Sequence, residues 1–473
     1  MPSSRIFARL DVLLALGVLA SLETQLRFVV GGLDPGALLL AVWIAACGFL
    51  EWRRPRELPP KFAFEIAIFW MTIAFALNVG LCFSILSGEM LDLGLVLHDA
   101  VAYTLLAAIT FILALDVNVA CRLRRVQWII VVVGSVFMLV QIAESTGMFD
   151  IPNIDPWYWD RWRAWTDNPN QLALFCLLLG FTALHLAHSE TGALKRSTAI
   201  FAVALFVGAG TMAKSNAFLL AVLIGLCVLL AATFVRLIWR LERRRVPAAA
   251  VALAAMALLV YVGVIGLGLS ASKHLNLANA AGGVARQDRN GDEETALRFT
   301  LWGEALDRAA NAWMLGYGPG PHLPIPQIIL SGRRGGDQPK NVQRPKPGSA
   351  PNFETHDTTL EFLVQGGIIA VAAAVALCGL ALARAFRAGL DGLAAALIAI
   401  GIFGAFHVVF RHPFIWLLLC TALSAVERRR IASPSAGNGL ASARSNFPPR
   451  RWAAQAVLPR YPFAFSPSRW IDP

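Results

Sequence analysis

The chain has 473 residues, of which 57% are apolar, and its mean hydropathy is +0.60. Soluble domains carry roughly 45–50% apolar residues, so the composition excludes an ordinary soluble fold and predicts a polytopic membrane protein. The net charge of +11 does not indicate a nucleic-acid partner, because the basic residues form short clusters between apolar runs. The seven cysteines lie in or beside those runs, which argues against a disulfide framework or a cysteine metal site.

Apolar runs of membrane-spanning length follow one another along the chain. A spanning helix needs roughly 20 mostly apolar residues. On that criterion the sequence predicts twelve spans, near 10–30, 35–51, 62–87, 96–117, 126–146, 168–187, 197–213, 216–236, 247–270, 358–383, 391–407 and 412–427. In the first of them, Glu23, Gln25 and Arg27 are expected to lie outside the hydrocarbon. Arg5 and Arg9 precede this span without a following cleavage site, which indicates an uncleaved signal anchor.

The predicted fold class is therefore all-α, with four regions. Residues 1–271 hold the first nine spans, 272–357 form one long polar loop, and 358–427 hold the last three spans. The tail at 428–473 is rich in Ser, Pro, Ala and Arg, and it is expected to be disordered.

The uneven distribution of basic residues predicts the orientation of the chain in the membrane. Alternate connections hold most of the basic residues, namely Arg5, Arg9, Arg53, Arg54, Arg56, Lys61, Arg122, Arg124, Arg125, Lys195, Arg196, Arg236, Arg240, Arg243, Arg244, Arg245, Arg384 and Arg387. The positive-inside rule then places both termini in the cytoplasm and the loop 272–357 outside. An even number of spans requires both termini to lie on the same side, so the count of twelve agrees with two cytoplasmic termini.

Two outer connections carry candidate binding residues. The connection 147–167 gathers aromatic residues around Arg161 and Arg163, namely Trp157, Tyr158, Trp159, Trp162 and Trp165. These rings either stack on sugars or form an interfacial aromatic belt. Lys214 lies at another outer junction, where it either snorkels to the interface or contacts a phosphate, and Arg411 has the same two interpretations.

The polar loop is predicted to contain an amphipathic helix near 293–314. One of its faces is expected to hold Arg298, Trp302, Ala305, Ala309 and Trp313. Arg298 lies in the middle of this apolar stripe, where a guanidinium is costly unless an anion meets it. The residue is either an anion clamp suited to phosphate, or a snorkelling side chain or ordinary ion pair with Glu294 or Glu304.

Glycines follow this helix, in Gly316-Tyr317-Gly318-Pro319-Gly320. The backbone at Gly316 and Gly318 either approaches a phosphate closely or only turns the chain. No metal-ligand cluster appears in the outer loop, so a metal is not expected.

His356 is predicted to lie just before the N-terminus of a helix. Thr358 and Glu361 have the spacing of a capping box, which would start the helix at Thr358. A neutral imidazole near the positive end of a helix can act as a general base, with Glu361 or Asp357 orienting the ring. The alternative is a solvated loop histidine.

Four stretches, in this order, resemble the O-antigen ligase/polymerase family of bacterial envelope glycosyltransferases. They are Asn168-Pro169-Asn170, Thr211 to Ala217, Arg298 to Gly320 with Trp302 and the glycines, and His356-Asp357-Thr358-Thr359-Leu360-Glu361 with Gly366-Gly367. The likeness covers roughly residues 150–410. The sequence departs from the family pattern at Asn216, where the family has Arg, and at Asp357, where it has Asn. Lys214 would then have to supply the missing cation.

The resemblance implies transfer of a glycan from undecaprenyl pyrophosphate to a hydroxyl of lipid A–core, or of another glycan acceptor, at the outer face of the bacterial inner membrane. It implies that His356 removes the acceptor proton and that Arg298, helped by Lys214, stabilises the departing pyrophosphate, with inversion at the sugar and no cofactor. The family's substrate-binding residues would correspond to Lys214, Arg163, Asn168, Asn170, Trp302, Gly316, Gly318 and Arg411.

Two other activities of the same family remain open at this point, because acceptor choice depends on loop shape. They are a polymerase that joins repeat units on the lipid carrier and a transferase that delivers the glycan to protein. A flippase or transporter is a further alternative, which would favour ionisable groups near mid-span and internal symmetry. Membrane lipids are expected partners in every case.

Overall fold

The computed structural model describes residues 3–29, 34–52, 61–158, 160–241, 287–324 and 353–425, all within the unit Met1–Arg429. The predicted span 247–270, two parts of the predicted loop (272–286 and 325–352) and the tail 428–473 lie outside the described residues.

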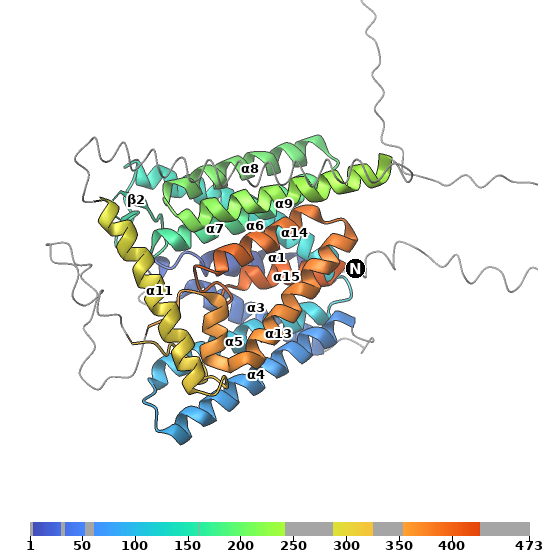
Figure 1. Cartoon of the computed structure of the whole chain (residues 1–473). Coiled ribbons are helices and arrows are strands. Elements are labelled where there is room, and N and C mark those ends of the chain that lie inside the picture. The colour runs from blue at the N-terminus through green and yellow to red at the C-terminus, as the bar shows by residue number, and fades with distance from the viewer. Residues whose placement is uncertain are drawn as a thin grey trace, which may run out of the picture. The chain divides into compact units, whose positions relative to one another are not determined.

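The described chain is almost entirely helical (Figure 1). Its longer helices are α1 (Ser3–Ala20), α3 (Pro35–Trp52), α4 (Lys61–Ser87), α5 (Leu93–Leu115), α6 (Val119–Ser145), α7 (Pro169–Ser189), α8 (Ala193–Met212), α9 (Asn216–Leu241), α11 (Gln287–Asn311) and α13 (Thr358–Ala388). The shorter elements are α2 (Leu26–Val29), α14 (Asp391–Gly404), α15 (Pro413–Leu423) and the antiparallel strands β1 (Trp157–Tyr158) and β2 (Arg161–Trp162). Within the described residues, eight helices are long and apolar enough to cross a membrane, namely α3 to α9 and α13. The protein is a polytopic membrane protein.

Three predicted spans differ from the structure. The bounds 10–30 are wrong, because α1 covers Ser3–Ala20 and the chain turns before Glu23. The runs at 391–407 and 412–427 form α14 with 14 residues and α15 with 11. At a rise of about 1.5 Å per residue these two helices cover only about 21 and 16 Å of the roughly 30 Å of hydrocarbon, so a crossing would also need residues outside the helix.

Exposed apolar side chains mark the lipid-facing surfaces. On α4, Phe64, Ile68, Met71 and Phe75 form a stripe at helical spacing and are each at least 60% exposed. A stripe of this kind is costly in water and favourable in lipid. By contrast, α7 is buried along nearly its whole length and packs against α6, α8, α9 and α14, which makes it the central helix of the bundle.

Ion pairs join helix ends that are far apart in sequence. They are Arg122–Asp11, Arg124–Glu190, Arg236–Asp391 and Arg384–Glu65. These contacts bring together the starts of α4, α6 and α14 and the ends of α7, α9 and α13. We call this the basic end of the bundle, because it carries the basic connections found in the sequence.

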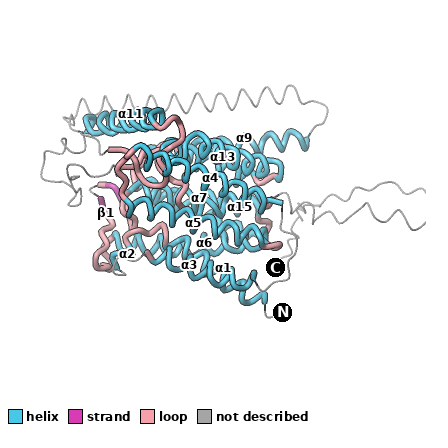
Figure 2. The backbone as a smooth tube through the Cα atoms, turned by 90° about the horizontal axis from the view of Figure 1, so that it is seen from below, coloured by secondary structure: helices cyan, strands magenta, loops and turns pink. Residues whose placement is uncertain are grey.

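The opposite end, which we call the site end, carries α11 and the β1–β2 ribbon. Figure 1 shows α11 running across the direction of α4 and α9, and Figure 2 places α11 and β1 toward the same end of the helices. Gln25 helps to hold this end together, since its side-chain amide donates to the backbone carbonyls of Asp155, Ala164 and Thr166.

Candidate functional site

The helix predicted in the polar loop exists, and its apolar face fixes it on the bundle. α11 ends at Asn311, and Leu301, Ala305 and Ala312 are buried against Tyr317 and Val364. Trp313 does not belong to this face as predicted. It follows the helix with φ 55° and is 82% exposed, because the chain reverses direction there.

The glycine loop and a break in α13 form one hydrogen-bonded unit. α13 is interrupted at Gly367 (φ 65°), so carbonyls before the break lose their helical partners. The N–H groups of Tyr317 and Gly318 donate to the carbonyls of Val364 and Gln365, both at 2.8 Å. Gly316 and Gly318 have φ 86° and 91°, conformations that glycine adopts without strain. Their backbone therefore packs against α4 and α13.

The helix start next to His356 is capped one residue earlier than predicted. Asp357 is the N-cap and accepts the N–H of Leu360 at 2.8 Å, with Thr358 as the first helical residue. Glu361 instead accepts the backbone N–H and the hydroxyl of Thr355, each at 3.0 Å. Neither Asp357 nor Glu361 hydrogen-bonds the His356 ring, so the predicted orienting contact is absent from the described residues.

His356 and Arg298 act on each other electrostatically. Burial lowers the pKa of His356, and the Arg298 guanidinium lowers it further, while Glu354 raises it. The His356 ring lies edge-on to Phe353 at 5.2 Å, and the guanidinium lies over the Phe406 ring at 5.6 Å. The two predicted catalytic residues thus lie within electrostatic range of each other, although α11 carries one and the segment before α13 carries the other.

Two further residues join this cluster. His407 follows α14, and its pKa falls to about 3 through burial, Arg298, His356 and Arg161. Arg161 comes from β2 and donates to the Ala213 carbonyl at 3.0 Å and the Asn170 side chain at 3.1 Å. We call Arg161, Arg298, His356 and His407 the cationic cluster.

Two members of the cationic cluster have unused hydrogen-bonding capacity. Within the described side chains, Arg298 makes neither an ion pair nor a hydrogen bond, and the alternative pair with Glu304 is not formed. The side chain of Glu294 lies outside the described residues. Neither ring nitrogen of His356 is hydrogen-bonded within the described ranges. Among the described residues, a guanidinium fork and an imidazole are therefore left for a ligand.

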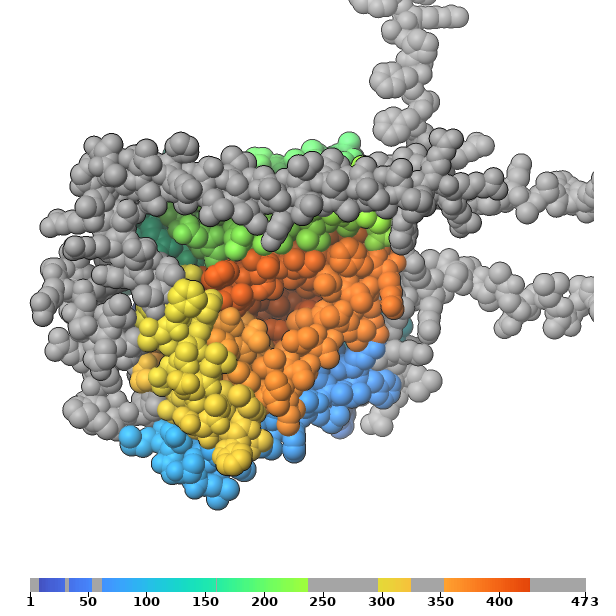
Figure 3. All heavy atoms as spheres, viewed as in Figure 1, coloured from blue at the N-terminus to red at the C-terminus, as the bar shows by residue number. Residues whose placement is uncertain are grey.

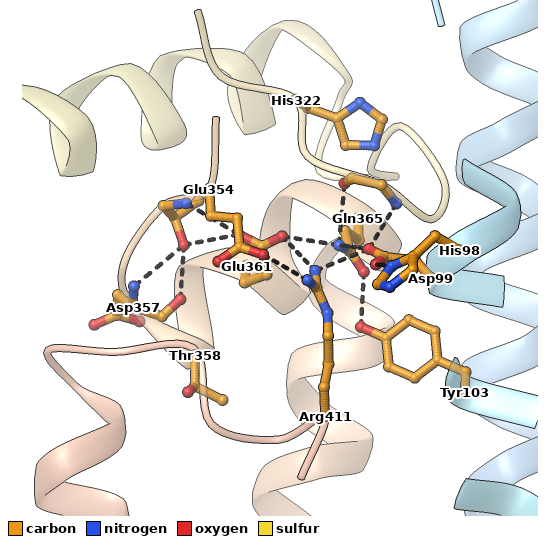
Figure 4. Close-up of polar contacts among 12 residues, drawn as sticks. His98, Asp99, Tyr103, His322, Glu354, Asp357, Thr358, Glu361, Gln365 and Arg411 are labelled. Carbon is orange, nitrogen blue, oxygen red and sulfur yellow. Dashed lines mark hydrogen bonds and ion pairs between the residues drawn. The ribbon is translucent and has the colours of Figure 1, made fainter. Parts of the chain in front are cut away.

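Arg411 lies in a different environment from the one expected (Figure 4). Its side chain is 17% exposed and forms ion pairs with Asp99 at 2.8 Å, Glu354 at 2.6 Å and Glu361 at 2.9 Å. Protein carboxylates thus occupy its terminal donors. Sequence inspection did not predict this network, because its acidic members are distant along the chain.

Gln365 connects Arg411 and its carboxylates to the glycine loop. Its amide donates to Asp99, Glu361 and the carbonyl of Gly320 at 3.1, 2.8 and 3.0 Å, and it accepts the Tyr103 hydroxyl at 2.8 Å. Figure 4 shows these side chains converging from α5, α13 and the segment after α14. The network fixes the start of α13 and with it the backbone at His356.

The remaining predicted binding residues have partners within the protein. Lys214 is exposed and pairs with Asp160 at 2.7 Å. Arg163 pairs with Asp155 at 2.7 Å. Asn168 caps α7 by accepting the N–H of Gln171 at 3.0 Å, and Pro169 fits the first helical position.

Trp302 lies beside the cationic cluster, with its ring 6.5 Å from that of Phe406. Its indole N–H is buried without a hydrogen-bond partner in the described residues. Sequence reasoning noted Arg161 without giving it a role and missed His407. The available signal for His407 was its position at the outer end of a predicted span.

An apolar cavity lies next to the cationic cluster. Figure 3 shows a hollow between α13 and α14, where a cavity of about 410 Å³ is lined by Phe362, Val375, Leu382, Leu397 and Leu419 among others. Thr358 also lines it, and its hydroxyl donates to the His407 carbonyl at 2.7 Å. The cavity and the cluster therefore share a boundary. The described residues contain no group of three or more His, Cys, Asp or Glu that could hold a metal ion.

Fold and site together define a multi-pass membrane protein with a cationic cluster at one helix end and an apolar cavity beside it. Residues 200–375, which include α9, α11 and the first part of α13, match the family model described as O-antigen ligase. This stretch of the chain is therefore similar to that family, which implies a membrane enzyme that transfers glycans. The resemblance stated from the sequence is confirmed. A search of curated proteins and a search of solved structures found no match.

Proposed function

We propose that the protein transfers a glycan from undecaprenyl pyrophosphate to a hydroxyl of lipid A–core at the outer face of the bacterial inner membrane. The observation that carries this proposal is the electrostatic influence of Arg298 on His356, two residues whose side chains have no hydrogen-bond or ion-pair partner among the described residues. A diphosphate leaving group needs a cation, and a hydroxyl nucleophile needs a base.

In this mechanism His356 accepts the proton of the acceptor hydroxyl. Burial and the Arg298 charge keep the imidazole neutral, which is the form that a base requires. The acceptor oxygen forms a bond to the anomeric carbon as the bond from that carbon to the diphosphate oxygen breaks. The electron pair leaves with the diphosphate, and Arg298 stabilises the added negative charge. Direct displacement inverts the anomeric carbon.

The apolar cavity supports a lipid-linked donor. A polyprenyl chain lying between α13 and α14 would have its diphosphate at the boundary formed by Thr358, next to the cationic cluster. Such a chain buries apolar surface in the cavity while its charged head meets guanidinium groups. Membrane lipids would fill the same cavity when the donor is absent.

The distribution of charge in the structure supports the proposed orientation of the protein in the membrane. The basic connections lie at the basic end of the bundle and the cationic cluster lies at the site end. The positive-inside rule then places both termini in the cytoplasm and the cluster in the periplasm. In this topology, twelve membrane segments include α1, α14, α15 and the apolar run 247–270.

The same chemistry would serve a polymerase or a transferase that delivers glycan to protein, since only the acceptor differs. Purified protein in nanodiscs, supplied with glycan-linked undecaprenyl pyrophosphate and lipid A–core, is expected to form the ligated product without an ion gradient. In a deletion strain, long chains on the carrier with bare core would support the ligase. Core bearing a single repeat would instead indicate a polymerase. Movement of the lipid-linked glycan across the bilayer without any transfer would refute the proposal in favour of a flippase.

A further inference from the structure

His407 has a buried ring nitrogen that the protein does not use. Its Nε2 atom has no hydrogen-bond partner in the described residues. Buried polar groups in proteins are nearly always hydrogen-bonded, and one left unpaired is costly. A ligand bound at the adjoining apolar cavity would supply the partner that the described residues do not.

The protein holds the His407 ring in place through other contacts. The ring stacks on Phe403 with centroids 4.7 Å apart and an interplanar angle of 29°. The backbone carbonyl of His407 accepts the hydroxyl of Thr358 at 2.7 Å, and the same hydroxyl accepts the Val409 N–H at 3.0 Å. These contacts position the ring and its backbone without using Nε2.

The position of His407 fits the head of an anionic lipid. Gly404 and Val409, on either side of it in sequence, line the apolar cavity together with Thr358. Arg298 and Arg161 both impose positive potential on the ring, and burial acts in the same direction, so the imidazole is neutral near pH 7. A neutral imidazole carries one N–H donor. An N–H donor in the positive potential of Arg298 and Arg161 suits a ligand with several negatively charged oxygens.

We propose that His407 binds the diphosphate of the lipid-linked donor, with its Nε2–H donating a hydrogen bond to an oxygen held between Arg298 and Arg161. This inference rests on the proposed function and extends it. His407 becomes a substrate-binding residue, distinct from the base His356. The indole N–H of Trp302 is not required for this contact.

The experiment measures binding without requiring turnover. Protein in nanodiscs is titrated with undecaprenyl diphosphate and, separately, with undecaprenol, which has the same chain without phosphate. His407→Phe keeps the stacking surface for Phe403 and removes the N–H. It is expected to weaken binding of the diphosphate by about 10–100-fold, the usual effect of losing a hydrogen bond to a charged group. Its affinity for undecaprenol is expected to stay within about twofold of the wild-type value.

A conservative variant and a matched control complete the design. His407→Gln keeps an N–H donor and is expected to recover part of the diphosphate affinity. His412→Gln changes another histidine of the same connection, whose pKa responds to Arg411 rather than to Arg298, and it should bind both lipids as the wild type does. Thermal unfolding of each variant separates loss of binding from loss of folding.

The outcomes for His407 and for the proposed function are distinguishable. Unchanged diphosphate affinity in both folded His407 variants would overturn the inference, even if His356 and Arg298 prove essential for transfer. Equal losses of diphosphate and undecaprenol affinity would overturn it as well, because they would show a packing role. Absence of transfer by the wild type, with diphosphate binding that depends on His407, would refute the transferase and leave a diphosphate-lipid binding site.

Discussion

The guanidinium of Arg298, on α11, lowers the pKa of the His356 imidazole, which lies just before α13. One element comes from the polar loop and the other begins a membrane helix, so only packing of α11 on α13 brings them together. In the proposed function, this relationship supplies a cation and a neutral base near each other. Transfer from a diphosphate donor requires both.

Replacing Arg298 tests the anion clamp. Arg298→Lys is expected to reduce transfer by about 100-fold or more, because a point charge cannot make the planar two-pronged contact with a phosphate. Initial rates in nanodiscs measure this change. The matched control is Arg308→Lys on the same helix, since Arg308 already pairs with Glu89 at 3.0 Å. Near-normal turnover by the Arg298 variant would show that the residue has a structural role only.

Replacing His356 tests the base. His356 has φ 55°, a left-handed conformation that asparagine tolerates better than most residues. His356→Asn is therefore expected to insert and fold normally but to lose transfer by about 100-fold or more, since general-base catalysis typically contributes 10²–10⁴-fold. Transfer rates and thermal unfolding are compared in the same preparation. Normal glycan products would remove His356 from the mechanism.

The pH dependence follows from the charges around His356. The base works only unprotonated, so activity falls as pH drops through its pKa, which burial and Arg298 place below the ordinary 6.5. Glu354 raises this pKa. Glu354→Gln should therefore move the acid limb of kcat/KM to lower pH, whereas Glu304→Gln should leave it in place. A shift toward higher pH would contradict the assigned electrostatics.

The break in α13 is expected to tolerate only glycine. A Cβ at Gly367 would lie 2.0 Å from the Met314 carbonyl oxygen, and φ at this position is 65°. Gly367→Ala should destabilise the protein by more than about 2 kcal/mol, through both the clash and the backbone strain. In contrast, a Cβ at Gly303 on α11 meets nothing within 4 Å, so Gly303→Ala should be neutral or stabilising. Melting temperatures in detergent measure the difference.

Glu23 predicts a loss of stability as the pH rises from about 4.5 to about 8. Burial raises its pKa from 4.5 to about 8, and Gln141 donates to it. Because the folded pKa exceeds the unfolded one, the contribution of Glu23 to stability is complete below pH 4.5 and is lost as pH rises through about 8. Wild-type stability should fall over this window by up to about 1.4 kcal/mol per pH unit.

Glu23→Gln is the variant that tests this dependence. It keeps an acceptor for Gln141 and removes the ionisation, so its melting temperature should vary less between pH 5 and pH 8 than that of the wild type. Asp150→Asn alters an exposed carboxylate and should retain the wild-type pH dependence. Identical pH profiles for wild type and Glu23→Gln would show that Glu23 is ionised in the folded protein.

The sequence by itself determined the class of fold and the positions of most long helices. Apolar runs such as 62–87 and 168–187 predict helices, because a chain in lipid must satisfy its backbone hydrogen bonds within helices. Local sequence patterns also predicted the N-cap of α13 to within one position. The predicted cap was Thr358, and the structure has Asp357. The pairing of Arg298 with His356 was expected from resemblance, and not from any local pattern.

Only the tertiary structure decided which charged side chains are paired with other described residues and which are not. Arg298 and Arg411 look alike in the sequence, as single arginines at outer positions. Packing gives Arg411 three carboxylates from distant segments and leaves Arg298 facing an aromatic ring, and it brings His407 into the same cluster. Hydropathy is a property of neighbouring residues along the chain, whereas burial and ion pairing depend on contacts between segments that the chain order does not specify.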